Sequence, residues 1–206
     1  MSALPVIVYF HGFASSGASG TAQLLRRRFR DARVLSPDIP LDPAEALPFL
    51  KRFCTEHAAE LIVGSSMGGM YAQQMRGFRR ICANPAFHLS KMYDILRPGR
   101  FAWMNRRENG EKEGKVTQEI VAHFRAMEEK QFDGITPEDR ELCWGIFGRR
   151  DERVHGYDEF VSRYPHAEWF DGPHRLNDSV IDEVVVPLAR RLLAGAEPPP
   201  PDAFFR

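Results

Sequence analysis

The sequence of 206 residues predicts an α/β fold in which helices flank a mostly parallel sheet of about six strands. Short apolar runs alternate along the chain with longer stretches of helical periodicity, which is the pattern of parallel strands joined by crossover helices. Most runs are apolar throughout, as in residues 6–10, and this is typical of a sheet covered on both faces. A chain of this length buries roughly 70% of its unfolded surface, so one core can stabilise it without disulfides or metals.

The apolar runs place the strands in chain order, at residues 5–10, 32–36, 60–64, 79–84, 141–147 and 166–170. Helices are expected at about 19–30, 43–57, 67–77, 116–130, 156–164 and 178–194. Asp42 is a suitable N-cap for the second helix because Pro43 and Glu45 follow it. Pro48 and Pro187 are candidate kinks in the second and the last helix.

Residues 1–195 are predicted to form one domain, within which residues 86–140 interrupt the alternation of strands and helices. This segment is too long for a single loop. Its polar stretch, 105–115, predicts a mobile hairpin within a mostly helical, cap-like insertion. Residues 196–206 include four consecutive prolines, which fit neither a helix nor a central strand, so we expect a disordered tail.

Composition excludes several classes of function. The 28 Lys and Arg residues balance 28 Asp and Glu residues, and a net charge of zero gives no long-range attraction to nucleic acid or anionic lipid. The chain starts without a basic leader and contains no apolar run of about 18 residues. Three widely spaced cysteines without a C-x-x-C pair predict neither a disulfide framework nor a zinc site. We therefore expect a cytoplasmic protein with no nucleic-acid or membrane partner.

The strongest motif is Gly64-Ser65-Ser66-Met67-Gly68, which follows one predicted strand and leads into a predicted helix. It has the form G-x-S-x-G, in which a serine sits on a tight strand-to-helix turn that requires small neighbours. Only Ser66 fits this frame, so it is the candidate nucleophile. The N–H of Met67, at the start of the helix, is a candidate donor to an oxyanion. The alternative is a small-residue turn that only packs the helix on the strand.

A serine nucleophile needs a histidine and an acid, each in a turn after a later strand. Asp151 follows the strand at 141–147, with Glu152 as a second candidate and a solvated charged run as the alternative. His174 follows the strand at 166–170. His88, His123 and His155 occupy poor positions for a base.

The loop after the first strand offers the second oxyanion donor. Gly12 allows the chain to turn across the sheet edge, which leaves the N–H of Phe13 free. His11 more often braces such a loop than takes part in catalysis. Four apolar side chains in the insertion are candidates to wall a substrate pocket, with burial in the core as the alternative: Phe87, Phe101, Trp103 and Met104. No pair of histidines has metal-binding spacing, and this chemistry needs no cofactor or metal.

Taken together, these motifs resemble a known family. The set comprises Tyr9-Phe10-His11-Gly12-Phe13 with Ser15-Ser16, the serine motif with its helix, Asn84-Pro85-Ala86, and the late Gly172-Pro173-His174. It is similar to the small bacterial esterases of the YqiA/UPF0227 group of α/β hydrolases, over most of residues 5–195. The segment 148–152 is longer than in that group, and a Gly-Pro pair precedes His174 where a Gly-Gly pair is usual.

The resemblance implies a minimal α/β-hydrolase fold and activity toward esters with short acyl chains. It also implies that Ser66, Asp151 and His174 are the triad, that the amides of Phe13 and Met67 form the oxyanion hole, and that Asn84 lies beside the serine. The same machinery serves oxygen esters and thioesters, and the sequence does not separate them. A binding protein on a hydrolase fold is the alternative from another class.

Overall fold

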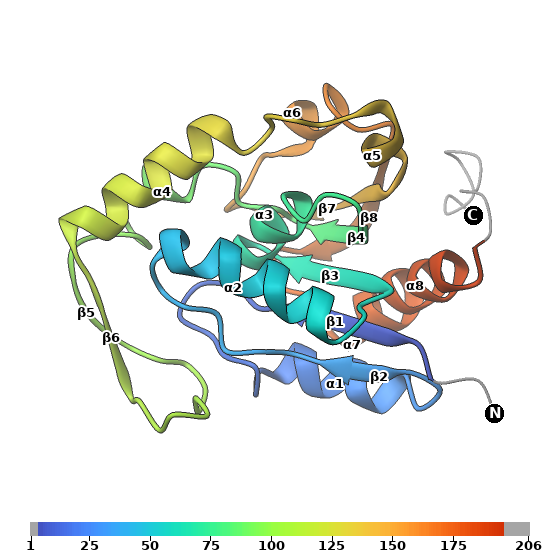
Figure 1. The fold of residues 1–206 in the computed structure, drawn as a ribbon, viewed down its shortest axis with the longest axis horizontal. Helices are drawn as coiled ribbons and strands as arrows, with labels where there is room; N and C mark the ends of the chain where they lie inside the picture. Colours follow the sequence, from blue (N-terminus) through green and yellow to red (C-terminus); the bar gives the residue numbers. More distant parts are fainter. Residues whose placement is uncertain (1–3, 196–206) are drawn as a thin grey trace.

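The computed structural model of the protein describes residues 4–195, and it contains a six-stranded sheet in which every neighbouring pair is parallel (Figure 1). The strand order is β2-β1-β3-β4-β7-β8, so β3 occupies a central place. All six predicted strands are confirmed: β1 (Val6–Phe10), β2 (Arg33–Leu35), β3 (Leu61–Ser65), β4 (Arg79–Ala83), β7 (Cys143–Arg150) and β8 (His166–Pro173).

Helices cover both faces of this sheet, which explains why the strands are apolar throughout. In β1, Ile7 and Tyr9 point to one face, while Val8 and Phe10 point to the other. The first face is covered by α1 (Gly20–Arg28) and the C-terminal helix. The second face is covered by four other helices: α2 (Pro43–Glu56), α3 (Met67–Gln73), α4 (Gln118–Lys130) and α6 (Tyr157–Val161).

The predicted helices are confirmed, with shorter ends. As expected, Asp42 caps α2 by accepting a hydrogen bond from the N–H of Ala44 at 2.8 Å. The C-terminal helix is continuous but changes geometry: α7 (Asp178–Val180) leads into a π-helical segment, η2 (Ile181–Val185), and then α8 (Val186–Leu193). The π segment lies just before Pro187, which cannot donate a helix hydrogen bond.

The insertion differs from the expectation of a mostly helical cap. Its first half is a short 3-10 turn, η1 (Leu89–Lys91), and an antiparallel β-hairpin made by β5 (Gly99–Ala102) and β6 (Glu113–Val116). Only the second half is helical, in α4 and α5 (Pro137–Glu141). A hairpin was expected in this segment and is present, but short, mixed polar strands leave no clear period in the sequence, so the pattern did not give the bounds of the two strands.

The hairpin lies beyond the carboxyl ends of the strands (Figure 1).

The other end of the insertion is anchored at α5, which contains Asp139. The buried guanidinium of Arg80 donates to both carboxylate oxygens of Asp139, at 2.8 and 2.9 Å. A bidentate pair of this kind has the geometry that can compensate for the desolvation of two charges.

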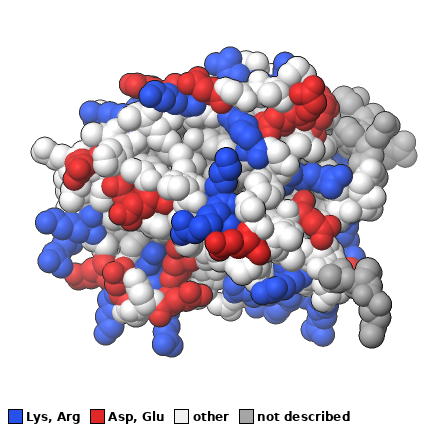
Figure 2. All heavy atoms as spheres, viewed as in Figure 1, with Lys and Arg blue, Asp and Glu red and all other residues white. Residues whose placement is uncertain are grey.

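Charges of both signs are interspersed on the face shown in Figure 2. Within residues 4–195, no helix has the length and apolar character that crossing a membrane would require. Cys54, Cys82 and Cys143 are buried free thiols. The expected tail at 196–206 lies outside the described residues.

Candidate active site

Ser66 stands between β3 and α3 with φ 56° and ψ −121°, a conformation rarely adopted by residues other than glycine. The close approach of strand and helix depends on the two flanking glycines. A Cβ on Gly64 would lie 2.1 Å from the carbonyl oxygen of Gly68, and one on Gly68 would lie 2.0 Å from the carbonyl oxygen of Phe10. The G-x-S-x-G pattern is therefore a steric requirement of this turn.

The structure brings Ser66, His174 and Asp151 into one hydrogen-bonded chain. His174 Nε2 lies 3.0 Å from Ser66 Oγ, and its Nδ1 lies 2.7 Å from Asp151 Oδ2. A neutral imidazole that donates from Nδ1 to the carboxylate can accept the serine proton at Nε2. The neighbouring Ser65 is engaged elsewhere, because its Oγ lies 2.7 Å from the hydroxyl of Tyr9.

Asp151 is fixed by its backbone neighbours as well as by the imidazole. Its Oδ1 accepts hydrogen bonds from the N–H groups of Arg153 and Val154, at 2.8 and 3.1 Å. Burial alone would raise the pKa of Asp151, but the hydrogen bonds from His174 and from these amides outweigh burial and hold it below its usual value. Glu152 is exposed, so of the two candidate acids the geometry places only Asp151 against the imidazole.

Residues 11–17, which we call the β1 loop, pass beside Ser66. A Cβ on Gly12 would lie 3.5 Å from Ser66 Cβ, so the loop and the serine are in contact. Within the described part of the chain, the N–H of Phe13 has no hydrogen-bond acceptor. The N–H of Met67 opens α3 and has no partner inside the helix. Both amides are thus available to a ligand near Ser66.

His11 braces the β1 loop, as the sequence suggested. Its Nε2 accepts a hydrogen bond from the N–H of Ile39 at 3.1 Å, so its Nδ1 donates to the carbonyl oxygen of Gly12 at 2.9 Å. The ring is 1% exposed, and this burial lowers its pKa to about 4. His11 is therefore a neutral structural link between the β1 loop and the segment after β2.

Asn84, which the resemblance placed beside the serine, has a more extensive role than the sequence indicated. It has φ 43° and directly follows β4. Its side chain accepts from the N–H of Gly148 at 2.7 Å and donates to the carbonyl oxygen of His174 at 3.0 Å. It thereby ties the strand that carries the acid to the histidine segment. The asparagine before a proline was the available signal, since asparagine tolerates left-handed backbone.

The predicted pocket residues divide into two groups. Phe101 and Trp103 lie in the hairpin, where Phe101 packs against Phe13 with ring centroids 5.1 Å apart. Met104 is 56% exposed and its backbone N–H donates to the carbonyl oxygen of Ala14 at 2.8 Å. Phe87 is instead 2% exposed and belongs to the core, so the expectation that it faces a pocket is corrected.

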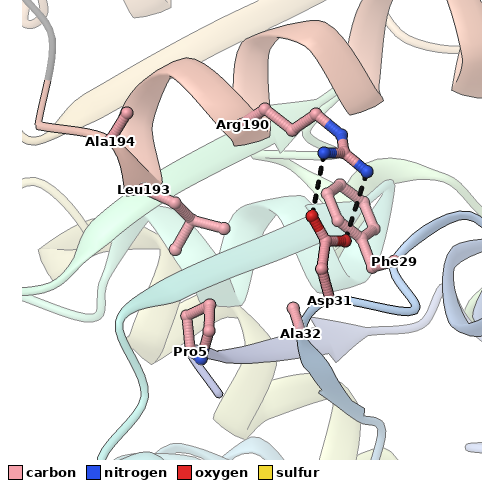
Figure 3. Close-up of a pocket in the computed structure, with 7 residues that line it drawn as sticks. All are labelled: Pro5, Phe29, Asp31, Ala32, Arg190, Leu193 and Ala194. Carbon is pink, nitrogen blue, oxygen red and sulfur yellow. Dashed lines mark hydrogen bonds and ion pairs between the residues drawn. The ribbon is translucent and has the colours of Figure 1, made fainter. Parts of the chain in front are cut away.

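The remaining histidines and the cavity drawn in Figure 3 lie outside this arrangement. His88 pairs with Glu159, and His123 pairs with Asp42, the N-cap of α2. The cavity in Figure 3 is near the amino end of β1 and the end of α8, away from the carboxyl edge that carries Ser66. It is lined by Pro5, Phe29, Asp31, Ala32, Arg190, Leu193 and Ala194.

The profile of the family described as "Uncharacterised protein family (UPF0227)" matches residues 6–179 of this chain. The chain belongs to this family. The matched region contains the serine turn, the acid and the histidine, and also the whole hairpin.

Solved structures of low sequence identity show the same fold, that of the α/β hydrolases. Est1E from Butyrivibrio proteoclasticus matches with a TM-score of 0.67 and 14% identity, over 92% of this chain and 88% of that one. Alpha/beta hydrolase domain-containing protein 10 from mouse matches with a TM-score of 0.64 and 15% identity, over 95% and 92%. Monoglyceride lipase from Saccharomyces cerevisiae matches with a TM-score of 0.58 and 12% identity, over 95% and 88%.

The depressed pKa of His11 predicts a pH-dependent stability. Between the ordinary value of 6.5 and about 4, the unfolded chain binds a proton at this residue that the folded chain does not. The free energy of unfolding that the neutral His11 contributes is fully present above pH 6.5 and is lost as the pH falls toward 4. The loss is about 3 kcal/mol at most. Urea unfolding across this range should show a shallower pH dependence for His11→Asn than for the wild type.

Replacement of the exposed His155 by Asn is the matched control, and it should leave the pH dependence of stability unchanged. A His11→Asn variant that loses stability with falling pH as steeply as the wild type would contradict the buried neutral imidazole.

Proposed function

We propose that this protein is a serine hydrolase that cleaves carboxylic esters with small or short acyl groups. The observation that carries the proposal is the hydrogen-bonded chain from Ser66 Oγ through His174 to Asp151, set on a strained turn at the start of a helix. The alternative of a small-residue packing turn does not account for an imidazole and a buried carboxylate in line with the serine hydroxyl. Similarity in fold to a monoglyceride lipase supports the choice of ester hydrolysis.

In the first half of the proposed reaction, Ser66 Oγ attacks the ester carbonyl carbon while His174 Nε2 takes the hydroxyl proton. Asp151 keeps the imidazole oriented and stabilises the positive charge that develops on it. The carbonyl oxygen becomes an oxyanion, which the N–H groups of Phe13 and Met67 stabilise by hydrogen bonds. The C–O bond to the alcohol then breaks, and His174 returns the proton to the departing oxygen.

In the second half, water replaces the alcohol. His174 takes a proton from the water as its oxygen attacks the acyl carbon, and the same two amides receive the second oxyanion. Collapse of this intermediate breaks the bond to Ser66 Oγ, which regains its proton from His174, and the acid leaves. Apart from the ester and the water, every group that takes part in these steps belongs to the protein.

The proposed preference for short acyl chains is supported by the aromatic side chains that pack beside the β1 loop. Phe13, Phe101 and Trp103 form a chain of aromatic contacts, with centroid distances of 5.1 and 4.7 Å. Phe13, whose N–H is the proposed oxyanion donor, is joined to the hairpin by these ring contacts. The acyl group therefore meets apolar surface close to the serine. A hairpin of two four-residue strands provides a small wall rather than a long tunnel.

Replacement of Ser66 by Ala should reduce ester turnover by up to roughly a millionfold, because the serine, histidine and acid act as a unit. The assay is hydrolysis of p-nitrophenyl acetate together with labelling by a fluorophosphonate, which needs an activated serine. Ser65→Ala is the matched control, since the Ser65 hydroxyl contacts Tyr9, and it should keep most of the activity. Substantial turnover by a pure Ser66→Ala protein would exclude this serine as the nucleophile.

Replacement of Asp151 by Asn should lower kcat by around ten-thousandfold, because the amide cannot hold the imidazole in the productive tautomer. Glu152→Gln makes the equivalent change at the exposed neighbouring residue and should have almost no effect. Steady-state kinetics of the two variants decide the assignment, and the opposite ranking would transfer the role to Glu152.

Activity against p-nitrophenyl esters of increasing acyl length should be highest from acetyl to butyryl and should fall sharply by octanoyl. Each methylene that fits against the aromatic wall gains at most about 1 to 3 kcal/mol, and one that meets the hairpin loses that gain. The measurement is kcat/KM for each ester. If kcat/KM still increases at decanoyl and dodecanoyl esters, the short-chain specificity is wrong.

A further inference from the structure

The end of the β5–β6 hairpin is bonded to the β1 loop by several hydrogen bonds. We call residues 103–108 the hairpin tip. The backbone N–H of Met104 donates to the carbonyl oxygen of Ala14 at 2.8 Å. Ser15 Oγ donates to Asn105 Oδ1 at 2.9 Å, and Ser16 Oγ donates to the carbonyl oxygen of Arg106 at 2.8 Å. Three consecutive residues of the β1 loop are thus held by three consecutive residues of the hairpin tip.

The β1 loop needs such support because its backbone is strained. Ala14, the residue after Phe13, has φ 58°, a left-handed conformation that a Cβ disfavours. Strained residues of this kind persist only where surrounding contacts fix them. The contact made to Ala14 comes from Met104, and the contact made to the next residue comes from Asn105. The hairpin tip therefore holds Ala14 through the carbonyl oxygen of Ala14, and it holds the next residue, Ser15, through the Ser15 side chain.

The hairpin tip is itself anchored to the domain, so it can act as a fixed support. Arg107 is 6% exposed, and its guanidinium lies 4.1 Å from the Trp103 ring centroid and donates to the carbonyl oxygen of Ile39 at 3.1 Å. The N–H of Glu108 donates to Asp38 Oδ2 at 2.7 Å. Asp38 Oδ1 in turn accepts from the N–H of Gly17 at 2.8 Å, at the far end of the β1 loop.

We propose that the hairpin tip positions the oxyanion hole, with Asn105 acting through Ser15 as a positioning residue for the N–H of Phe13. This inference rests on the proposed esterase function. An oxyanion is stabilised only by donors held at hydrogen-bond distance from the place where its charge develops, so a small displacement of the Phe13 peptide weakens the transition state more than the bound substrate. The insertion is then part of the catalytic apparatus as well as a wall for the acyl group.

The test compares Asn105→Ala with Asn105→Asp, whose carboxylate oxygen can still accept from Ser15 Oγ. Asn109→Ala is the matched control, because Asn109 lies in the same hairpin and, within residues 4–195, its side chain hydrogen-bonds to the N–H of Glu111 and not to the β1 loop. We expect Asn105→Ala to lower kcat toward p-nitrophenyl acetate by about tenfold to a hundredfold, with KM within about twofold of the wild type. Asn105→Asp should restore most of kcat, and Asn109→Ala should match the wild type.

A second readout separates positioning from stability. A trifluoromethyl ketone forms a hemiketal with Ser66 whose oxyanion occupies the same hole, so its inhibition constant should rise by the factor by which kcat/KM falls. If Asn105→Ala does not fold, Ser15→Ala removes the same hydrogen bond from the other side and should give the same result. Thermal unfolding confirms that all assays are made on folded protein.

The outcomes are distinguishable. A folded Asn105→Ala or Ser15→Ala protein with wild-type kcat and inhibitor affinity overturns the positioning role, and so does an equal loss in Asn109→Ala. Failure of the proposed function has a different signature, since the wild type would then neither hydrolyse the ester nor react with a fluorophosphonate.

Discussion

The left-handed backbone of Ser66 determines where the other groups of the candidate site lie. The turn exists because Gly64 and Gly68 allow α3 to approach β3 and the end of β1 at distances that any side chain would prevent. This approach places the β1 loop against Ser66, where a Cβ on Gly12 would lie 3.9 Å from the serine Oγ, at the start of α3. Because the sheet is parallel, β4, β7 and β8 end at the same edge as β3, and the segments that follow these strands begin there. The acid and the histidine reach Ser66 from there.

Polar side chains that are buried or partly buried help to set the relative positions of these segments. Asn84 connects the end of β7 to the histidine segment, His11 connects the β1 loop to the chain after β2, and Asp38 connects that chain to both the β1 loop and the hairpin. Each has polar partners on more than one segment, so its burial costs little and fixes geometry. The site is thus held by specific hydrogen bonds between loops, in addition to the packing of Phe13 against Phe101.

The strands, most helices, Ser66 and His174 could be predicted because each depends on a local pattern. A continuous apolar run, a capping residue and the spacing of glycines around a serine are all visible within a few positions. Asp151 and Glu152 could not be separated from the sequence, since both follow the same strand and only the fold shows which carboxylate meets the imidazole. The hydrogen bond between Ser15 and Asn105 could not be predicted, because the two residues lie 90 positions apart and no local pattern pairs them.

The structure of the insertion, residues 86–140, was also only partly predictable from the sequence. Its hairpin was expected to be mobile because residues 105–115 are polar, but the residues at its tip make the hydrogen bonds to the β1 loop described above. Phe87 was grouped with Phe101 and Trp103, but it packs into the core, whereas Phe101 packs against Phe13 of the β1 loop and Trp103 packs against Phe101. Residue type alone does not distinguish an aromatic ring that supports a segment from one that faces a substrate.

The hydrogen bonds from the β1 loop to the hairpin span 90 positions of sequence, and the one between Ser66 and His174 spans 108. The serine turn needs only β3, α3 and the neighbouring strands, whereas the acid, the histidine and the hairpin come from segments that are synthesised later. Contacts over such separations form after the local ones, because closing long loops costs entropy that only the nearly complete fold repays. A chain that has not yet formed these contacts therefore lacks the imidazole and the carboxylate that line up with the Ser66 hydroxyl. Under the proposed function, reactivity is a property of the finished fold, and the growing chain is protected from premature acylation by its own topology.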